Sequence, residues 1–244
     1  MFLIMGGLSL YVYGFLALAI APAIALMVYV YRQDRLDKEP AQLLWRLVTM
    51  GVIAAAFAGI LEEVGMATLG LFSGLDPNSA RFTVVSDFLV VGVVEEGLKY
   101  ALMARQTWSH PAFNARFDGV VYAVFTSLGF AATENVMYGL MYGPGVLFGR
   151  ALMAIPAHMG FAVLFGMLYG EAKLLSTRGH DIAGAACIVI GYVLAVFLHG
   201  LYDSAAMVGS EDTELVFLLV VAAIYVIVFC VARVAARHDR RFRA

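Results

Sequence analysis

Long apolar stretches separated by short polar breaks are the dominant pattern along the chain. Each stretch has roughly 17 or more residues, which is enough for a helix to cross the hydrocarbon core of a bilayer. The breaks between them contain Pro, Gly, Asn and Asp, the ordinary residues of turns. The pattern predicts an all-α polytopic membrane protein, a bundle of about seven transmembrane helices that forms a single domain over residues 1–244. The stretches are 7–31, 43–71, 88–104, 118–141, 147–171, 182–207 and 215–236.

Composition agrees with this pattern and excludes several classes of protein. The chain is 62% hydrophobic and 14% charged, whereas soluble domains average about 25% charged residues. The net charge of −2 and the lack of a basic stripe argue against a nucleic-acid partner. Cys187 and Cys230 both lie inside apolar stretches, which excludes a disulfide framework or a paired-cysteine metal site. We therefore expect a multi-pass protein of the cell membrane whose surroundings are the lipid bilayer.

The distribution of basic residues predicts the orientation. Thirteen of the 16 Lys and Arg residues fall in loops on one side of the predicted bundle, while Arg81 and Arg150 fall on the other. Because the cytoplasmic side has the excess of Lys and Arg, the N-terminus is predicted outside and the C-terminus in the cytoplasm. No basic residue precedes Arg32, so the first stretch lacks the basic segment of a cleavable signal peptide and is expected to be a retained helix.

Three charged residues lie within five positions of the third stretch: Glu95, Glu96 and Lys99. A charge near the bilayer centre costs about 2.5 to 3.5 kcal/mol on insertion scales, so these groups need partners or a water-filled cavity. Neighbouring side chains on a helix point about 100° apart. We therefore expect Lys99 to form a good ion pair with only one glutamate, which leaves the other for chemistry. A purely structural triad is the alternative interpretation.

Further titratable residues lie at a similar predicted depth in other helices. At 1.5 Å per residue, Glu95, Glu134, His158 and His199 lie about 10 to 16 Å from the external helix ends. The pattern predicts that they meet in one layer, although Glu134 and His158 could each serve only as interhelical hydrogen-bonding groups. The role of Glu62 and Glu63, at the same depth, stays open. The residues predicted to share this layer are Glu95, Glu96, Glu134, His158, His199 and Asp203.

Several carboxylates and two imidazoles could activate a water molecule by general acid–base catalysis and stabilise an oxyanion. The same residues could bind a divalent metal such as zinc, although the chain has no HExxH motif. A serine nucleophile is disfavoured because Ser204 lies about 140° around the helix from His199. Two other functions remain open. One is an ion-coupled transporter that uses the acids as a proton or cation relay, and the other is a non-catalytic membrane scaffold.

Four short motifs, each in a separate predicted helix, resemble the PrsW family of intramembrane proteases. They are EExxK at Glu95, Glu96 and Lys99, FxxxE at Phe130 and Glu134, Pro-Ala-His at His158, and HxxxD at His199 and Asp203. The segments Asp34 to Pro40 and Asp118 to Tyr122 add to the resemblance. Any one motif is short, but their order along nearly the whole chain is fairly specific.

The resemblance implies an endopeptidase that cleaves a membrane-anchored protein, typically an anti-sigma factor, near the external face. By comparison with the wider superfamily of prenyl endopeptidases, Glu95 would be the base, Glu134 its partner, and His199 with Asp203 the oxyanion side. Glu96 would then pair with Lys99. That superfamily has His in place of Glu134 and Asn in place of Asp203. No cofactor is firmly predicted, but a divalent metal is retained as a candidate, with Glu96, Glu134, His158 and His199 as its ligands.

Overall fold

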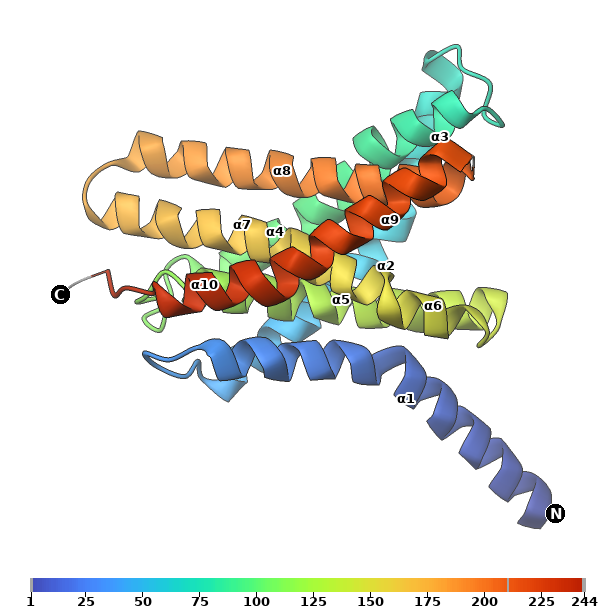
Figure 1. Cartoon of the computed structure of the whole chain (residues 1–244), viewed down its shortest axis with the longest axis horizontal. Helices are drawn as coiled ribbons and strands as arrows, with labels where there is room; N and C mark the ends of the chain where they lie inside the picture. The colour runs from blue at the N-terminus through green and yellow to red at the C-terminus, as the bar shows by residue number, and fades with distance from the viewer. Residues whose placement is uncertain (1, 210, 243–244) are drawn as a thin grey trace.

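The computed structural model describes residues 2–209 and 211–242, which form seven helical rods (Figure 1). They match the seven apolar stretches. Six are long and apolar enough to cross a membrane, and the third contains the charged triad. In chain order the rods are α1 (Phe2–Gln33), α2 (Ala41–Phe72), α3 (Ala80–Ser86) with η1 (Asp87–Gly92) and α4 (Val93–Thr107), α5 (Asp118–Tyr142), α6 (Val146–Leu152) with α7 (Ala154–Thr177), α8 (Asp181–Val208), and α9 (Glu211–Val226) with η2 (Ile227–Val231) and α10 (Ala232–Arg237).

Helix α5 lies at the centre of the bundle, where α1, α2, α4 and α7 pack against it. Small residues allow these helices to approach closely, as is common between transmembrane helices. A Cβ atom added to Gly166 of α7 would lie 2.6 Å from the backbone oxygen of Gly119 in α5. A Cβ atom added to Gly51 of α2 would lie 2.1 Å from the backbone oxygen of Thr126. Glycine at these positions therefore sets the distance between the helices that hold the polar layer.

The third rod has a π-helical segment, η1, directly before the glutamate pair. A π turn inserts one extra residue and rotates the side chains that follow it, and such turns are frequent at functional sites. Gly92, the last residue of η1, lies close to α8, because a Cβ atom there would be 3.1 Å from the backbone oxygen of Val196. The rod thus presents Glu95 and Glu96 toward the interior of the bundle.

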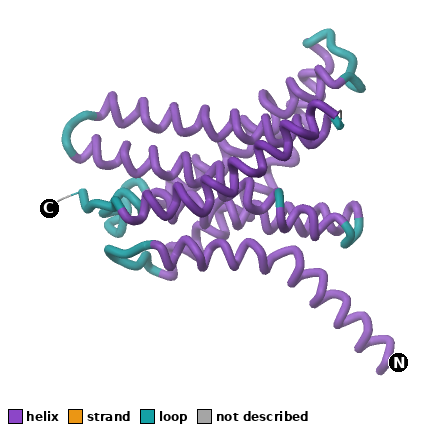
Figure 2. The backbone as a smooth tube through the Cα atoms, viewed as in Figure 1, coloured by secondary structure: helices purple, strands orange, loops and turns teal. Residues whose placement is uncertain are grey.

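The connections gather at two opposite ends of the bundle (Figure 2). One end has the α1–α2, α4–α5 and α7–α8 connections together with the C-terminal tail, and this is the end predicted to be cytoplasmic. The other has the α2–α3, α5–α6 and α8–α9 connections. The N-terminal part of α1, a helix that contains Pro22, diverges from the other rods (Figure 1). Proline in a helix removes one backbone hydrogen bond and commonly produces a bend.

Candidate functional site

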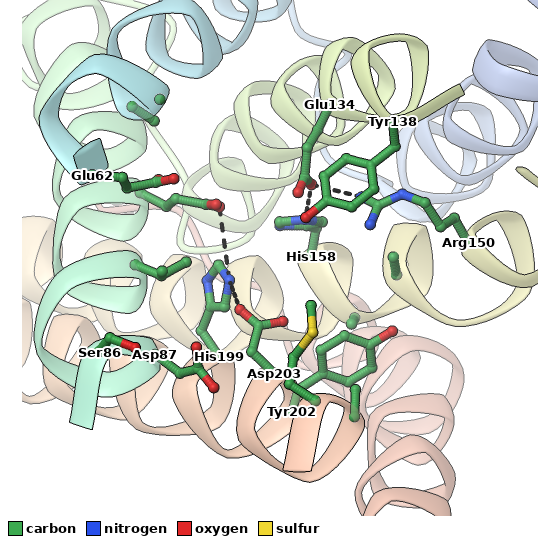
Figure 3. A pocket seen from close by; sticks show the side chains of 18 of the residues that line it. Glu62, Ser86, Asp87, Glu134, Tyr138, Arg150, His158, His199, Tyr202 and Asp203 are labelled. Atoms are coloured by element: carbon green, nitrogen blue, oxygen red, sulfur yellow. Dashed lines mark hydrogen bonds and ion pairs between the residues drawn. The ribbon is translucent and has the colours of Figure 1, made fainter. Parts of the chain in front are cut away.

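A polar cavity of about 720 Å³ lies between the helices in the half of the bundle with the α2–α3 and α8–α9 connections. Its apolar wall includes Phe130, Met153 and Phe161, and it extends to Pro77 and Phe217 near those connections. Figure 3 shows polar side chains of α2, α5, α6, α7 and α8 around this space. The titratable groups that line the cavity are Glu62, Asp87, Glu95, Glu134, Tyr138, Arg150, His158, His199, Tyr202 and Asp203.

Lys99 lies behind the cavity wall and is fully buried. Its ammonium group is 3.0 Å from Glu95 Oε2, 2.7 Å from Glu96 Oε1 and 3.1 Å from His158 Nδ1. An ammonium group has three hydrogens to donate, so these acceptors use all of them. The expectation that Lys99 pairs well with only one glutamate is therefore wrong. Lys99 follows one turn after both acids, and its long, flexible stem places the ammonium between their carboxylates.

The two adjacent glutamates occupy different environments. Glu95 lines the cavity, whereas Glu96 is fully buried and does not reach it. Glu96 Oε1 accepts hydrogen bonds from Lys99 and from His199 Nδ1, the latter at 2.8 Å. Glu96 Oε2 is buried and has no hydrogen-bond partner among the described residues. Glu95 thus lies at the cavity wall, while Glu96 joins α4 to α8.

His158 is fixed by polar contacts on both of its ring nitrogens. Because an ammonium group can only donate, His158 Nδ1 accepts from Lys99. His158 Nε2 therefore bears the hydrogen, which it donates to Glu134 Oε2 at 2.9 Å. Arg150 reaches the same Glu134 oxygen at 2.9 Å and donates to Asn135 at 2.8 Å. Figure 3 shows Glu134 directed at both His158 and Arg150. These contacts select one neutral tautomer of His158.

His199 lies on the opposite wall of the cavity, between two carboxylates. Its Nδ1 faces Glu96, and its Nε2 is 3.1 Å from Asp203 Oδ2 and 3.7 Å from Glu95 Oε2. Phe161 stacks on the imidazole with ring centroids 5.1 Å apart. Asp203 follows one turn later on α8, so its contact is the i, i+4 pair that the HxxxD motif predicts. This contact orients His199.

All six residues predicted to share the layer are thus brought together, five of them at the cavity wall and Glu96 directly behind it. Glu62 joins them, whereas Glu63 is exposed outside. Ser204 is buried and does not line the cavity. Sequence reasoning counted Arg150 only among the basic residues of the external side and missed its place in the site. The available signal was a charged residue inside the apolar stretch 147–171.

Four side chains form a donor set that a divalent metal could share: Glu95, Glu96, His158 and His199. One ligand atom from each lies within 4.8 Å of the others. The metal ligands predicted from the sequence included Glu134 in place of Glu95. In the structure, Glu134 contacts Nε2 of His158, the nitrogen that does not face Lys99. Glu134 would therefore orient His158 as a ligand and not bind the metal itself. Two imidazoles with carboxylates on their other nitrogens are typical of zinc centres. The unpartnered Oε2 of Glu96 adds a further donor, so the residues fit a metal.

Lys99 is the main complication for metal binding. Its ammonium contacts donor atoms on three of the four residues. A divalent cation bound to these atoms would therefore compete with the ammonium for the same lone pairs. A metal could therefore bind all four residues only if the Lys99 ammonium moved away.

Comparisons with known proteins assign the chain to a family. A model of the PrsW family, described as intramembrane metalloproteases, matches residues 39–232, most of the chain. The chain belongs to the PrsW family. It is therefore a multi-pass membrane protein and a protease, which favours this interpretation over a transporter or a scaffold. The matched range includes every residue of the polar layer, and the family description agrees with a buried cluster of acids and imidazoles able to bind a metal.

Individual PrsW relatives are similar over most of their length. Protease PrsW of Bacillus subtilis (strain 168) is 30% identical over 191 residues, which cover 78% of this chain and 82% of that protein. Protease PrsW of Halalkalibacterium halodurans is 27% identical over 220 residues, or 90% and 94% of the two chains. Protease PrsW of Geobacillus kaustophilus is 28% identical over 191 residues, or 78% and 79%. No solved structure matches the chain.

Proposed function

We propose that this PrsW-family chain cleaves a membrane-anchored protein with a water molecule activated by Glu95. The observation that supports this role is the difference between the two glutamates. Glu95 lines the cavity, whereas Glu96 is fully buried against Lys99 and His199. A general base must be within hydrogen-bond reach of the water whose proton it removes. Glu95 meets this requirement, and Glu96 does not.

In the proposed reaction, Glu95 accepts a proton from water as the water oxygen attacks the carbonyl carbon of the scissile peptide bond. The protonated Glu95 then returns the proton to the amide nitrogen, and the C–N bond breaks. Lys99 holds Glu95 in place from behind, at 3.0 Å. His158 and Glu134, whose Nε2 and Oε2 atoms are 2.9 Å apart, form the cavity wall beside Glu95. His158 Nδ1 accepts a hydrogen bond from Lys99 and so holds the lysine in place. Such preorganisation saves reorientation during the reaction.

The developing oxyanion requires hydrogen-bond donors, and His199 is the candidate for this role. Both of its nitrogens face carboxylates, at Glu96 and Asp203, and it can donate to both only as an imidazolium. Its Nε2 lies at the cavity wall between Glu95 and Asp203. Asp203 would repel an oxyanion if it faced one alone, but its 3.1 Å contact makes it the residue that orients His199. Because both N–H groups already bond to carboxylates, His199 would stabilise the oxyanion through the positive charge of its ring at the cavity wall.

The cavity also suggests the position of cleavage. It extends to the α2–α3 and α8–α9 connections, at the end of the bundle with few basic residues. That end is predicted to be external, so we propose cleavage near the external boundary of the substrate's membrane span. The resemblance to the PrsW family implies the class of substrate, an anti-sigma-factor-like protein with a single membrane span. Zinc is the proposed metal, because it accepts a mixed set of imidazole and carboxylate ligands. In the metal-bound protein, His199 would be a neutral ligand instead of an imidazolium, and Lys99 would lie away from the donor atoms. When bound, such an ion acts as a Lewis acid.

The proposal is tested by separating the two glutamates. The chain is reconstituted in vesicles with a single-span anti-sigma factor from the same genome, tagged on both sides of its span, and cleavage is followed by immunoblotting. Glu95→Gln should lower the rate by about 10² to 10⁴, the usual contribution of a general base. Glu96→Gln should weaken the Lys99 contact, lower the melting temperature and retain partial activity.

Glu63→Gln is the matched control, because Glu63 follows Glu62 as Glu96 follows Glu95 but is exposed outside the cavity. It should cleave at the wild-type rate. Full activity in Glu95→Gln would reject the assignment of the base. Equal and complete inactivation of Glu95→Gln and Glu96→Gln, without any loss of stability, would instead indicate that both glutamates bind a metal. Elemental analysis of the active wild-type protein then identifies the ion.

A further inference from the structure

A second group of acids lies on the α1–α2 connection and at the start of α5. These segments lie at the end of the bundle where α10 also lies, opposite the α2–α3 and α8–α9 connections (Figures 1 and 2). Asp34 and Glu39 belong to the connection between α1 and α2, and Asp118 is the first residue of α5. One carboxylate oxygen from each lies within 4.8 Å of the others. Two separate parts of the chain thus bring three acidic side chains together.

All three carboxyl groups are buried, and Asp34 lacks a hydrogen-bonding partner. The exposed fractions are 2% for Asp34, 4% for Glu39 and 2% for Asp118. Neither side-chain oxygen of Asp34 has a hydrogen-bond partner among the described residues. An isolated buried carboxylate is costly unless it is paired, protonated or bound to a metal. The two carboxylate oxygens of Asp34 therefore lie inside this buried group of acids without hydrogen-bond partners.

The basic residues nearby are engaged elsewhere. Lys38 donates to the backbone oxygens of Tyr31 and Asp34, each at 2.5 Å. Arg241 pairs with Asp37 at 2.7 Å. Within residues 2–209 and 211–242, none of the three acids forms an ion pair with Lys, Arg or His. Burial is also the main cause that raises the pKa of Asp34 to about 6 and that of Glu39 to about 8.

The other two carboxyl groups are held in defined orientations by donors that each occupy one oxygen. The Tyr122 hydroxyl donates to Glu39 Oε2 at 2.7 Å. The backbone amides of Asn114 and Ala115 donate to Asp118 Oδ2 at 2.9 and 2.7 Å. Ligands oriented by outer contacts of this kind are a common feature of metal sites. The carboxyl groups of Glu39 and Asp118 also lie close enough to each other to share a proton, whose place a bound cation would take.

We infer that Asp34, Glu39 and Asp118 bind a hard divalent cation, Mg²⁺ or Ca²⁺, at a site separate from the protease cavity. The donors are oxygens only, which favours these ions over zinc. Two ligands on opposite sides of Ca²⁺, at about 2.4 Å each, are about 4.8 Å apart. Because the three oxygens all lie within 4.8 Å of one another, they are close enough for a single ion of this kind to bind all of them. The cation would join the α1–α2 connection to α5, the helix that holds Glu134.

The test uses the purified full chain in detergent, stripped with EDTA and then titrated with Mg²⁺ or Ca²⁺ while thermal unfolding is measured. A cation at about 100 times its Kd should raise the melting temperature by about 5 to 10 °C for a chain of this size. Asp34→Asn should remove the shift. In EDTA the same variant should melt at or above the wild-type temperature, because it removes an unpaired buried charge. The larger of the two wild-type responses identifies the ion.

Two controls separate this site from the rest of the molecule. Asp37→Asn alters an exposed acid in the same connection and should keep the shift. Glu95→Gln, in the protease cavity, should keep it too, so a failure of the proposed protease mechanism leaves this result unaffected. No shift in the wild type, or an equal shift in Asp34→Asn, would overturn the inference and favour acids that share protons.

A direct binding measurement decides the matter if Asp34→Asn does not fold. Tb³⁺ takes the place of Ca²⁺ at oxygen sites, and excited tyrosine can sensitise its luminescence. Tyr122 contacts Glu39, which places a tyrosine beside the site. In the Glu95→Gln background, saturable Tb³⁺ luminescence that Ca²⁺ or Mg²⁺ displaces and that Tyr122→Phe weakens is expected. The absence of saturable luminescence would overturn the inference.

Discussion

Replacing Lys99 tests how the polar layer is held together. Lys99→Met keeps the length of the side chain but removes the ammonium that contacts Glu95, Glu96 and His158. Glu96 is fully buried behind the cavity wall, so water cannot readily replace its lost partner. Removal of one member of a buried ion pair costs about 3 to 5 kcal/mol. For a chain of this size, about 2 to 4 °C per kcal/mol gives a fall in melting temperature of about 6 to 20 °C.

The assay is thermal unfolding of purified variants in one detergent. Lys173→Met is the matched control, because Lys173 is only partly buried and donates to the Trp108 backbone oxygen. Its effect should be close to the value for one hydrogen bond, about 1 kcal/mol. The double variant Lys99→Met/Glu96→Gln should recover part of the loss, since contacting residues usually couple by about 0.5 to 3 kcal/mol. A melting temperature of Lys99→Met within about 2 °C of the wild type would refute the ion-pair network.

Two further substitutions examine helix packing and the orientation of Glu134. Gly51→Ala would place a methyl group 2.1 Å from the Thr126 backbone oxygen and should lower the melting temperature by roughly 2 to 12 °C, since overpacking costs about 1 to 3 kcal/mol. Gly70→Ala, on the same helix with no atom within 4 Å, should have no such effect, and equal melting temperatures would contradict the packing. Arg150→Met should lower cleavage by up to about 10²-fold through misplacement of Glu134, and wild-type cleavage in this variant would rule that role out. Arg81→Met, at an exposed arginine on the same side, should cleave normally.

The helices and the depth of the polar layer were predictable from the sequence because both depend on regular geometry. An apolar stretch of sufficient length must be helical in a membrane, where the backbone has to satisfy its own hydrogen bonds. The fixed rise per residue then places Glu134, His158 and His199 at one level without knowledge of how the helices pack. The HxxxD contact was similarly accessible, because the i, i+4 spacing joins His199 to Asp203 within a single helix.

The contacts that depend on rotation between helices were not predictable in this way. Spacing along α4 favours Glu95 over Glu96 as the partner of Lys99, yet both are bonded to it, and they differ in which helix each one meets. Glu96 meets His199 on α8, whereas Glu95 faces the cavity. The π-helical η1 segment changes the direction in which the Glu95 and Glu96 side chains point. Its extra residue cannot be recognised from the sequence, because it lies in an apolar run without a helical pattern of polar positions. Residues of identical chemistry, one position apart, therefore acquire different environments from packing alone. This is why the Glu95→Gln and Glu96→Gln comparison tests both the structure and the chemistry.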